Sequence, residues 1–300
     1  MKFGVMLGMG QGEGLAHPEY ATEAVLQAER LGFESVWAGE HVVMPDYTSA
    51  YPYSSDGRLP QSAQTDVPDP LVWLAYVAGI TTRIRLATGV LILPQRNPVV
   101  LAKEVATLDL LSRGRVILGV GVGWMREESE AIGVPFDARG TRMEEFIGAV
   151  RALWESDRAS FAGAHARFSG ARCYPKPVQA GSTVPIVVGG SGMVAAKRAG
   201  RLADGYYPIA PTVEALTELI TVMRRAATEA GREPDDVEVS TMSFALVGDD
   251  PVGPALLDSF HRMEDLGVSR IVVPRLLDCS PARIHASLDR LADQLLGSYV

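Results

Sequence analysis

Short apolar runs alternate along the chain with longer segments in which apolar residues recur every three or four positions. The short runs are apolar at successive positions, which predicts strands buried on both faces. These runs lie near Phe3 to Leu7, Ser35 to Ala38, Ile84 to Thr88, Val116 to Val120, Ile186 to Val188, Gly205 to Pro208, Val237 to Val247 and Arg270 to Val273. The longer segments predict amphipathic helices. They cover Pro18 to Leu31, Pro70 to Thr81, Pro98 to Leu111, Thr141 to Trp154, Met193 to Leu202, Val213 to Ala230, Pro251 to Leu266 and Pro281 to Leu296.

Proline and glycine mark the expected helix ends. Proline is tolerated in the first turn of a helix, where its missing N–H has no partner to lose, and glycine favours the left-handed conformation that ends one. Prolines stand near several helix starts, and Gly32, Gly231 and Gly267 stand where helices should stop. About eight strand–helix units in 300 residues predict an α/β fold, a parallel sheet closed into a (β/α)8 TIM barrel. No boundary divides the chain, so we expect residues 1–300 to form a single domain.

Two stretches exceed what a minimal barrel needs. Glu40 to Asp69 is rich in Tyr, Ser, Pro and Asp, and Ser160 to Thr183 is the second. The first stretch follows an expected strand end, and barrels place their active sites at the carboxyl ends of their strands. We therefore expect loop insertions at the C-terminal face, with Glu40 to Asp69 as a wall or lid of a pocket. A plain surface loop is the alternative.

Composition narrows the class of partner. The formal charge is −8 and the basic residues are scattered, which argues against nucleic acid and anionic membranes and favours a small-molecule substrate. Two cysteines, Cys173 and Cys279, and no clustered histidines argue against a disulfide framework or a metal site. The sequence has no signal-like segment and no run of about 18 apolar residues, so we expect a cytoplasmic enzyme.

Three strand-like runs end in glycine. The sharpest is Val184 to Gly192, which closes with Gly189-Gly190-Ser191-Gly192 before a helix. A strand that ends in glycines at a helix start exposes backbone N–H groups at the positive end of the helix dipole, which suits a phosphate. Similar junctions follow Ile84 to Val90 and Val116 to Gly123. This repetition predicts strands that end at one common face and hold a phosphorylated cofactor.

The segment from Arg83 to Trp124 carries a more specific signal. It reads RIRLATGVLILPQRNPVVLAKEVATLDLLSRGRVILGVGVGW and resembles the third and fourth βα units of the bacterial luciferase-like family. That family comprises flavin monooxygenases and coenzyme F420-dependent oxidoreductases built on barrels. The resemblance continues in Gly32 to His41 and in Val184 to Tyr207. It therefore extends over nearly the whole chain.

The resemblance implies where a cofactor should lie. Its ring is expected against Ala87, Thr88, Gly89 and Val90, with a non-proline cis peptide at Gly89–Val90. The Gly189, Gly190, Ser191 and Gly192 turn is expected to take the phosphate, and Gly121, Val122 and Gly123 to allow close approach of the backbone to the ring. From the residues alone, Gly89 could simply end a strand, and Gly121 to Gly123 could serve tight packing. Lys197 and Arg198 are expected on the outer face of the following helix.

Side-chain candidates follow the second expected strand. His41 is the foremost, because family members often carry a histidine there and an imidazole can exchange protons near neutral pH. Glu40 could orient His41 or cap the loop. Trp124, Tyr47 and Tyr51 are candidates for the substrate pocket, although a buried Trp is as often core. Arg96 could bind the cofactor tail or an anionic substrate, or form a surface ion pair.

Two departures from the family's sugar-phosphate dehydrogenases stand out. Val122 replaces a glutamate and Pro45 replaces a tryptophan, so glucose 6-phosphate is an unlikely substrate. The resemblance favours F420 as the cofactor, with FMN and monooxygenase chemistry as the alternative, and family members are often homodimers. A non-catalytic flavin-binding barrel is a further alternative. A nicotinamide-binding Rossmann fold is disfavoured, because the GxGxxA match at Gly190 lacks the acidic residue after the next strand.

Overall fold

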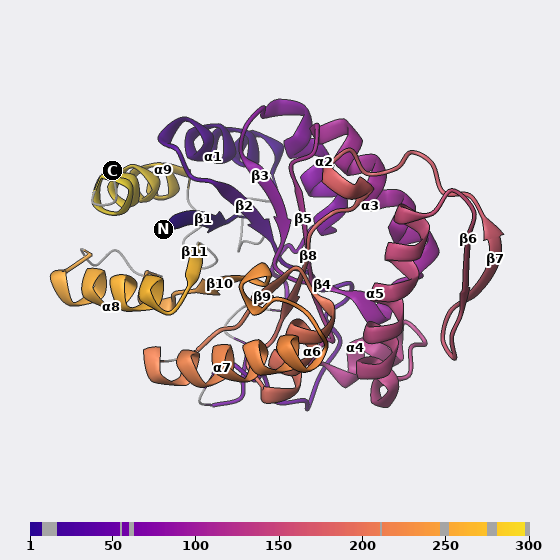
Figure 1. The fold of residues 1–300 in the computed structure, drawn as a ribbon. Helices are drawn as coiled ribbons and strands as arrows, with labels where there is room; N and C mark the ends of the chain where they lie inside the picture. The colour runs from indigo at the N-terminus through magenta and orange to yellow at the C-terminus, as the bar shows by residue number, and fades with distance from the viewer. Residues whose placement is uncertain are drawn as a thin grey trace.

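The computed structural model describes residues 1–7, 17–54, 56–59, 63–210, 212–246, 252–274 and 281–297. Within them, eight parallel strands form the barrel, and their bounds agree closely with the expected runs. They are β1 (Lys2–Met6), β2 (Ser35–Ala38), β3 (Arg85–Thr88), β5 (Val116–Gly121), β8 (Ile186–Gly189), β9 (Gly205–Tyr207), β10 (Glu238–Met242) and β11 (Val268–Pro274). Neighbours run β3-β2-β1-β11-β10-β9-β8-β5, and pairing of β3 with β5 closes the ring. The predicted TIM barrel is confirmed (Figure 1).

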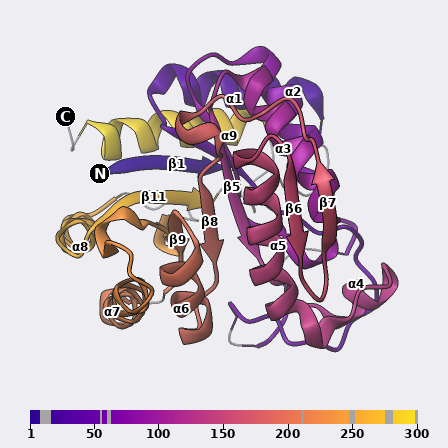
Figure 2. The same ribbon diagram turned by 45° about the vertical axis from the view of Figure 1, so that its right-hand side comes forward.

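Helices surround the barrel in Figures 1 and 2. They are α1 (Pro18–Leu31), α2 (Pro70–Ile80), α3 (Pro98–Ser112), α5 (Arg139–Glu155), α6 (Met193–Leu202), α7 (Val213–Glu229), α8 (Pro254–Asp265) and α9 (Pro281–Leu291), which continues as a π-helical turn over Ala292–Leu296. Side-chain oxygens of Asp69, Asn97 and Thr212 cap α2, α3 and α7 by accepting backbone N–H bonds. No described helix has the combination of length and apolar character needed to cross a membrane.

The structure differs from the expected elements in a few places. The run predicted over Val237 to Val247 ends as a strand at Met242 and continues as a 3-10 turn, Phe244–Leu246. Short elements with too few residues for a periodic signal were not expected: β4 (Leu91–Ile92), α4 (Arg126–Ala131) and the hairpin of β6 (Ala159–Ala162) and β7 (Arg167–Ala171). The hairpin occupies the first half of the second insertion and stands outside the barrel (Figure 1). Pro251, Val247 and Cys279 lie outside the described residues.

One surface expectation was wrong. Arg198 on α6 is buried, because its Nε donates to Glu144 Oε1 at 3.1 Å in the neighbouring helix α5. Lys197 is exposed, as expected. Cys173 is buried and free, in agreement with a packing role. Arg198 therefore ties α5 to α6 rather than facing water.

The apolar core has two parts. The larger lies between the strands and the surrounding helices. The smaller fills the inside of the barrel with one side chain from each of its eight strands: Met6, Trp37, Ala87, Ile117, Val187, Tyr207, Met242 and Val272. Inward-pointing side chains packed in this way make the barrel interior a solid support. A ligand can therefore bind only above it, at the ends of the strands.

A charged cluster lies within the strands below this layer. Arg270 of β11 is fully buried, donates from Nε and Nη2 to both carboxylate oxygens of Glu34 at 2.7 and 2.8 Å, and donates to Ser240 Oγ at 2.9 Å. Burial opposes ionisation of Glu238, but Arg270 and Lys2 outweigh it and lower the pKa of Glu238 to about 2. Removing one member of such a buried cluster leaves the others uncompensated. Its role is structural, since it is remote from the strand ends described next.

Candidate active site

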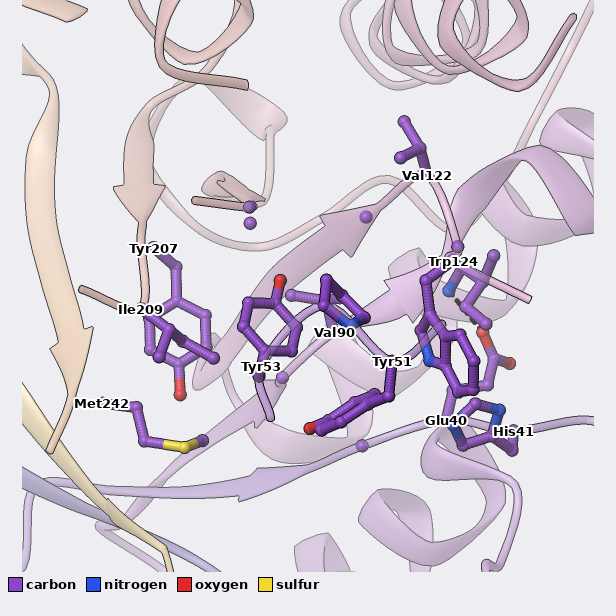
Figure 3. A pocket seen from close by; sticks show the side chains of 18 of the residues that line it. Glu40, His41, Tyr51, Tyr53, Val90, Val122, Trp124, Tyr207, Ile209 and Met242 are labelled. Carbon is purple, nitrogen blue, oxygen red and sulfur yellow. Dashed lines mark hydrogen bonds between the residues drawn. The ribbon is translucent and has the colours of Figure 1, made fainter. Parts of the chain in front are cut away.

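A cavity of about 410 Å³ opens at the carboxyl ends of the strands (Figure 3). The glycine junctions after β3, β5 and β8 all border it, as the sequence predicts. Its backbone walls are Gly39, Gly89, Gly121, Gly123, Gly189 and Gly190, and its side-chain walls are mainly apolar or aromatic: Met6, Tyr51, Pro52, Tyr53, Leu59, Val90, Ile92, Val122, Trp124, Tyr207, Ile209 and Met242. Glu40, His41 and Arg139 also line it. Its size is within the usual range for small-molecule sites.

The Gly89–Val90 peptide bond is cis, as the resemblance implied. The Val90 side chain lies over the ends of β5 and β8. A Cβ placed on Gly121 would come within 2.6 Å of Val90 Cγ2, and one placed on Gly189 within 2.7 Å of Val90 Cγ1. Both glycines therefore make room for Val90, which favours the packing interpretation of Gly121.

The turn before α6 leaves backbone donors available. Gly190 has φ +133°, and its N–H donates to the Tyr207 carbonyl at 3.2 Å. The first N–H bond of the helix runs from Ala196 to the Gly192 carbonyl, and no side chain caps the N-terminus. The N–H groups just before Ala196 are thus unused by the helix, which is the arrangement that binds anions. The Ser191 hydroxyl, in contrast, accepts the Ile209 N–H at 3.0 Å.

His41 and Glu128 form a buried pair at one side of the cavity. His41 Nδ1 lies 3.1 Å from Glu128 Oε2, and the Val42 N–H donates to Glu128 Oε1 at 2.6 Å. The side chains of His41 and Glu128 are 9% and 1% exposed. Glu128 lies on α4, and its carboxylate holds both the His41 imidazole and the backbone of the next residue, Val42. Figure 3 shows the His41 ring beside Trp124.

Glu40 has a different set of partners. Its carboxylate accepts the Ile92 N–H and the Arg96 guanidinium, whose Nε lies 2.9 Å from Oε1, and Arg96 also bonds Asp69 Oδ2 at 2.5 Å. Burial raises the pKa of Glu40, while Arg96 acts in the opposite direction. The carboxylate that orients His41 is therefore Glu128. Glu40 instead fixes the chain that follows the cis peptide.

An aromatic wall covers the His41 side of the cavity. Trp124 makes edge contacts with His41, Tyr47 and Tyr51, at ring-centre distances of 5.9, 5.4 and 5.3 Å. Burial raises the pKa of Tyr51 to about 12, so its hydroxyl remains neutral. The first insertion thus supplies part of the pocket wall.

Glu127, next to Glu128 on α4, fastens the same insertion. It accepts hydrogen bonds from the backbone N–H and the hydroxyl of both Thr48 and Ser49, at 2.7 to 3.3 Å. The backbone N–H of Thr48, with the Ser49 hydroxyl, lowers the pKa of Glu127 to about 2. The two consecutive carboxylates therefore hold different groups: Glu127 holds the first insertion, and Glu128 holds the His41 imidazole.

Comparison with known proteins identifies the family. The model of the luciferase-like monooxygenases matches residues 1–252. The chain belongs to the luciferase-like monooxygenase family. An F420-dependent glucose-6-phosphate dehydrogenase of Amycolatopsis mediterranei is 34% identical over 227 residues, which is 74% of this chain and 63% of that protein. The chain is accordingly an oxidoreductase of the luciferase-like type.

Solved structures of luciferase-like and F420-dependent proteins share the fold. The monooxygenase RslO1 from Streptomyces bottropensis superposes with a TM-score of 0.78 at 22% identity and covers all of both chains. An F420-dependent secondary alcohol dehydrogenase, solved with an F420-acetone adduct, superposes with a TM-score of 0.77 at 19% identity and covers 98% of each chain. At these identities the likeness establishes the fold alone.

The luciferase-like site contains most, but not all, of the predicted residues. Of the predicted set, those that do not line the cavity are Ala87, Thr88, Ser191, Gly192, Tyr47 and Arg96. Ala87 belongs to the interior layer, and the Thr88 hydroxyl donates to the Gly119 carbonyl at 2.6 Å. Gly192 is the N-cap of α6, and the Tyr47 hydroxyl accepts the Leu59 N–H at 3.3 Å. Arg96 is engaged by Glu40 and Asp69.

Sequence reasoning missed Glu128, Tyr207 and Met242. Glu128 lies in the Arg126–Ala131 helix, whose charged sequence is typical of a solvated surface. Tyr207 and Met242 end strands, and their sequence context placed them only within the expected runs Gly205 to Pro208 and Val237 to Val247. Nothing in their local pattern marks them, since only closure of the barrel brings their strands to the cavity. The described residues include no cluster of His, Cys, Asp and Glu suited to a metal ion.

Proposed function

We propose that the protein is an F420-dependent oxidoreductase that transfers a hydride between the deazaflavin and a small organic substrate. The observation that carries the proposal is the cavity itself. It combines glycine backbone from three strand ends, a mainly apolar lining and the His41–Glu128 pair in a family whose members include F420-dependent relatives at 34 to 36% identity.

The residues present fit such a cofactor. The cavity above Gly89 and Val90 is open, and its apolar lining suits a flat ring. The N–H groups in the first turn of α6, just before Ala196, are unused by the helix and available to a phosphate, and the Gly123 backbone, with φ +78°, borders the cavity. When bound, the deazaflavin supplies a carbon that accepts or donates the hydride. The open space also argues against a non-catalytic barrel, in which side chains would fill this region.

His41 is the candidate proton donor or acceptor for the substrate. Glu128 occupies Nδ1, so Nε2 is the nitrogen left for the cavity, with no partner in the described part of the chain. A carboxylate behind an imidazole fixes its orientation and stabilises its protonated form. Trp124 and Tyr51 exclude water from the same side, which strengthens electrostatic interactions in the site.

The substrate is inferred to be largely apolar. Among the described residues that line the cavity, Arg139 is the one arginine or lysine, and its Nη1 donates to the Phe136 carbonyl at 3.1 Å. A sugar phosphate requires several charged and hydroxyl-bonding groups, whereas Leu59, Ile92 and Val122 offer none. The lining therefore supports the exclusion of glucose 6-phosphate.

FMN-dependent monooxygenation is the second candidate. The family description and the RslO1 superposition favour it, because both refer to monooxygenases. In that case the aromatic wall would shield an oxygen-derived species from water. The two candidates share the ring site and the phosphate site, so the geometry does not separate them.

Binding measurements separate the candidates. Purified protein is titrated with F420, FMN and NADPH by fluorescence, and the cofactor that binds is then tested for turnover against a panel of enones, alcohols and alkanes. We expect tight F420 binding and oxygen-independent turnover. Tight FMN binding with oxygen consumption would replace the first proposal with the second.

His41→Ala tests the proposed proton role of the imidazole. The variant should fold and lose turnover, and full activity in it would exclude that role.

We also propose a homodimer. The outer faces of α2 and α3 expose apolar side chains in the first turn of each helix, including Val72 at 71% and Val100 at 53% exposure. Exposed apolar patches of this kind mark interfaces. Val100→Glu should convert the dimer to a monomer in sedimentation velocity, and at concentrations where both proteins are monomeric it should not lower Tm. A wild-type protein that sediments as a monomer would contradict the proposal.

A further inference from the structure

Tyr207 is the last residue of β9 and forms part of the deep wall of the cavity. Its ring stacks on Trp37 at a centre-to-centre distance of 4.8 Å and an interplanar angle of 30°, and only 3% of the residue is exposed. Met242 belongs to the same interior group of side chains. Figure 3 shows the Tyr207 hydroxyl beside Met242, at the opposite end of the cavity from His41.

The Tyr207 hydroxyl has no hydrogen-bond partner in the described part of the chain. The preceding residue provides a comparison, because Tyr206 is equally buried and its hydroxyl donates to the Gly190 carbonyl at 3.0 Å. Native structures rarely leave a buried hydroxyl unpaired, and each exception calls for an explanation. Burial also raises the pKa of Tyr207, so the hydroxyl is a donor at neutral pH.

We propose that the Tyr207 hydroxyl donates a hydrogen bond to a carbonyl oxygen of the cofactor ring, which makes it a binding residue for the ring's polar end. This rests on the proposed function. The deazaflavin and flavin rings both end in a pyrimidinedione, whose carbonyl oxygens are acceptors. The cofactor rather than the substrate is the partner, because Tyr207 belongs to the interior layer of the barrel, on which the cofactor ring would rest.

The test is Tyr207→Phe, which removes the hydroxyl and keeps the ring stacked on Trp37. The dissociation constants of F420 and FMN are measured by fluorescence titration without substrate. We expect binding of the preferred cofactor to weaken by about five- to tenfold, the size of one hydrogen bond. The carbonyl stretch of the bound cofactor, followed by Raman spectroscopy, should shift to higher frequency in the variant. An unchanged dissociation constant with an unchanged stretch would overturn the proposal.

Tyr206→Phe is the matched control for folding. Because Tyr206 donates to Gly190, its variant should unfold at a lower Tm without cofactor, whereas Tyr207→Phe should match or exceed the wild-type Tm. A marked loss of Tm in cofactor-free Tyr207→Phe would show that the hydroxyl has a partner within the protein, which refutes the assignment. Wild-type protein that binds neither F420 nor FMN would refute the proposed function and this assignment together. Wild-type binding with no effect of Tyr207→Phe would refute the assignment alone.

Discussion

Glu128→Gln tests the pair that holds the candidate catalytic imidazole. Glutamine keeps the size of the side chain and removes its charge. In the structure, one carboxylate oxygen accepts the Val42 N–H at 2.6 Å and the other lies 3.1 Å from His41 Nδ1. An amide offers a single acceptor oxygen. If that oxygen remains on Val42, the amide NH2 faces Nδ1, and His41 must then carry its neutral-state proton on Nε2.

The expected loss of turnover follows from replacing the charged carboxylate beside His41 with a neutral amide. A hydrogen bond to a charged group contributes about 1.5 to 3 kcal/mol, and about 1.4 kcal/mol corresponds to a factor of ten in rate. Loss of the Glu128–His41 bond should therefore reduce turnover about 10- to 100-fold through kcat. Both side chains are almost fully buried, so solvent does not replace the lost charge. The remaining bond to Val42 should keep the loop in place, with little change in Tm.

Two assays check the expectation. Heteronuclear NMR of nitrogen-labelled histidine reports which imidazole nitrogen carries the proton, with His41→Ala used to assign the signal. Turnover with the cofactor and substrate found by screening gives kcat and KM as a function of pH. Glu127→Gln is the matched control, because Glu127 bonds Thr48 and Ser49 and forms no hydrogen bond with His41 in the described part of the chain. That variant should raise KM by loosening the loop while the His41 signal stays unchanged.

Wild-type kcat and an unchanged His41 tautomer in Glu128→Gln would refute the reasoning. A fall in kcat of the same size in both variants would also count against it, because the effect would then come from the loop rather than the imidazole.

Two further outcomes are expected. Gly121→Ala should cost about 1 to 3 kcal/mol of unfolding free energy in urea and weaken cofactor binding, because its Cβ would come within 2.6 Å of the Val90 side chain. Gly79→Ala, with no atom within 4 Å of the new Cβ, should be neutral or stabilising. The pKa of Glu238 is about 2 in the folded protein and 4.5 in the unfolded chain. Ionised Glu238 therefore adds at most about 3 kcal/mol to the free energy of unfolding above pH 4.5, and this contribution is lost as the pH falls towards 2. Arg270→Met should lower stability by about 3 to 5 kcal/mol at neutral pH and flatten that acid dependence; equal pH profiles would contradict the cluster's role.

The fold could be predicted from the sequence because local signals and tertiary packing agree. The strands of the barrel are buried on both faces, as in β2 and β5, so each appears as a continuous apolar run. Helix ends coincide with proline and glycine, as at Pro18 and Gly32. The two-residue strand β4 is too short to appear as an apolar run, and the six-residue helix α4 is too short and too charged to show a helical period, so neither could be found in this way.

The site could be predicted only where a residue follows its strand directly. His41 and Gly89 were found because barrels place function at strand ends. The sequence left open whether the adjacent Glu40 orients His41 or caps the loop, and the bond to the imidazole comes from Glu128, 87 positions away in the sequence. Which of two carboxylates reaches an imidazole depends on how α4 packs against the first insertion. That packing is a tertiary property with no signature in either local sequence.

The polar groups at the cavity divide into those used by the protein and those left for a ligand. The carboxylates of Glu40 and Glu128 and the hydroxyl of Ser191 accept bonds from the chain itself. Apart from His41 Nε2, which is left for the reacting group of the substrate, what remains in the described structure is mainly donors: the Tyr207 hydroxyl, the Arg139 Nε and the N–H groups in the first turn of α6. A ligand that satisfies donors must bring acceptors, and carbonyl and phosphate oxygens do so while an apolar substrate does not. Polar recognition in this site therefore falls to the cofactor, and the aromatic and aliphatic walls are left to select the substrate by shape.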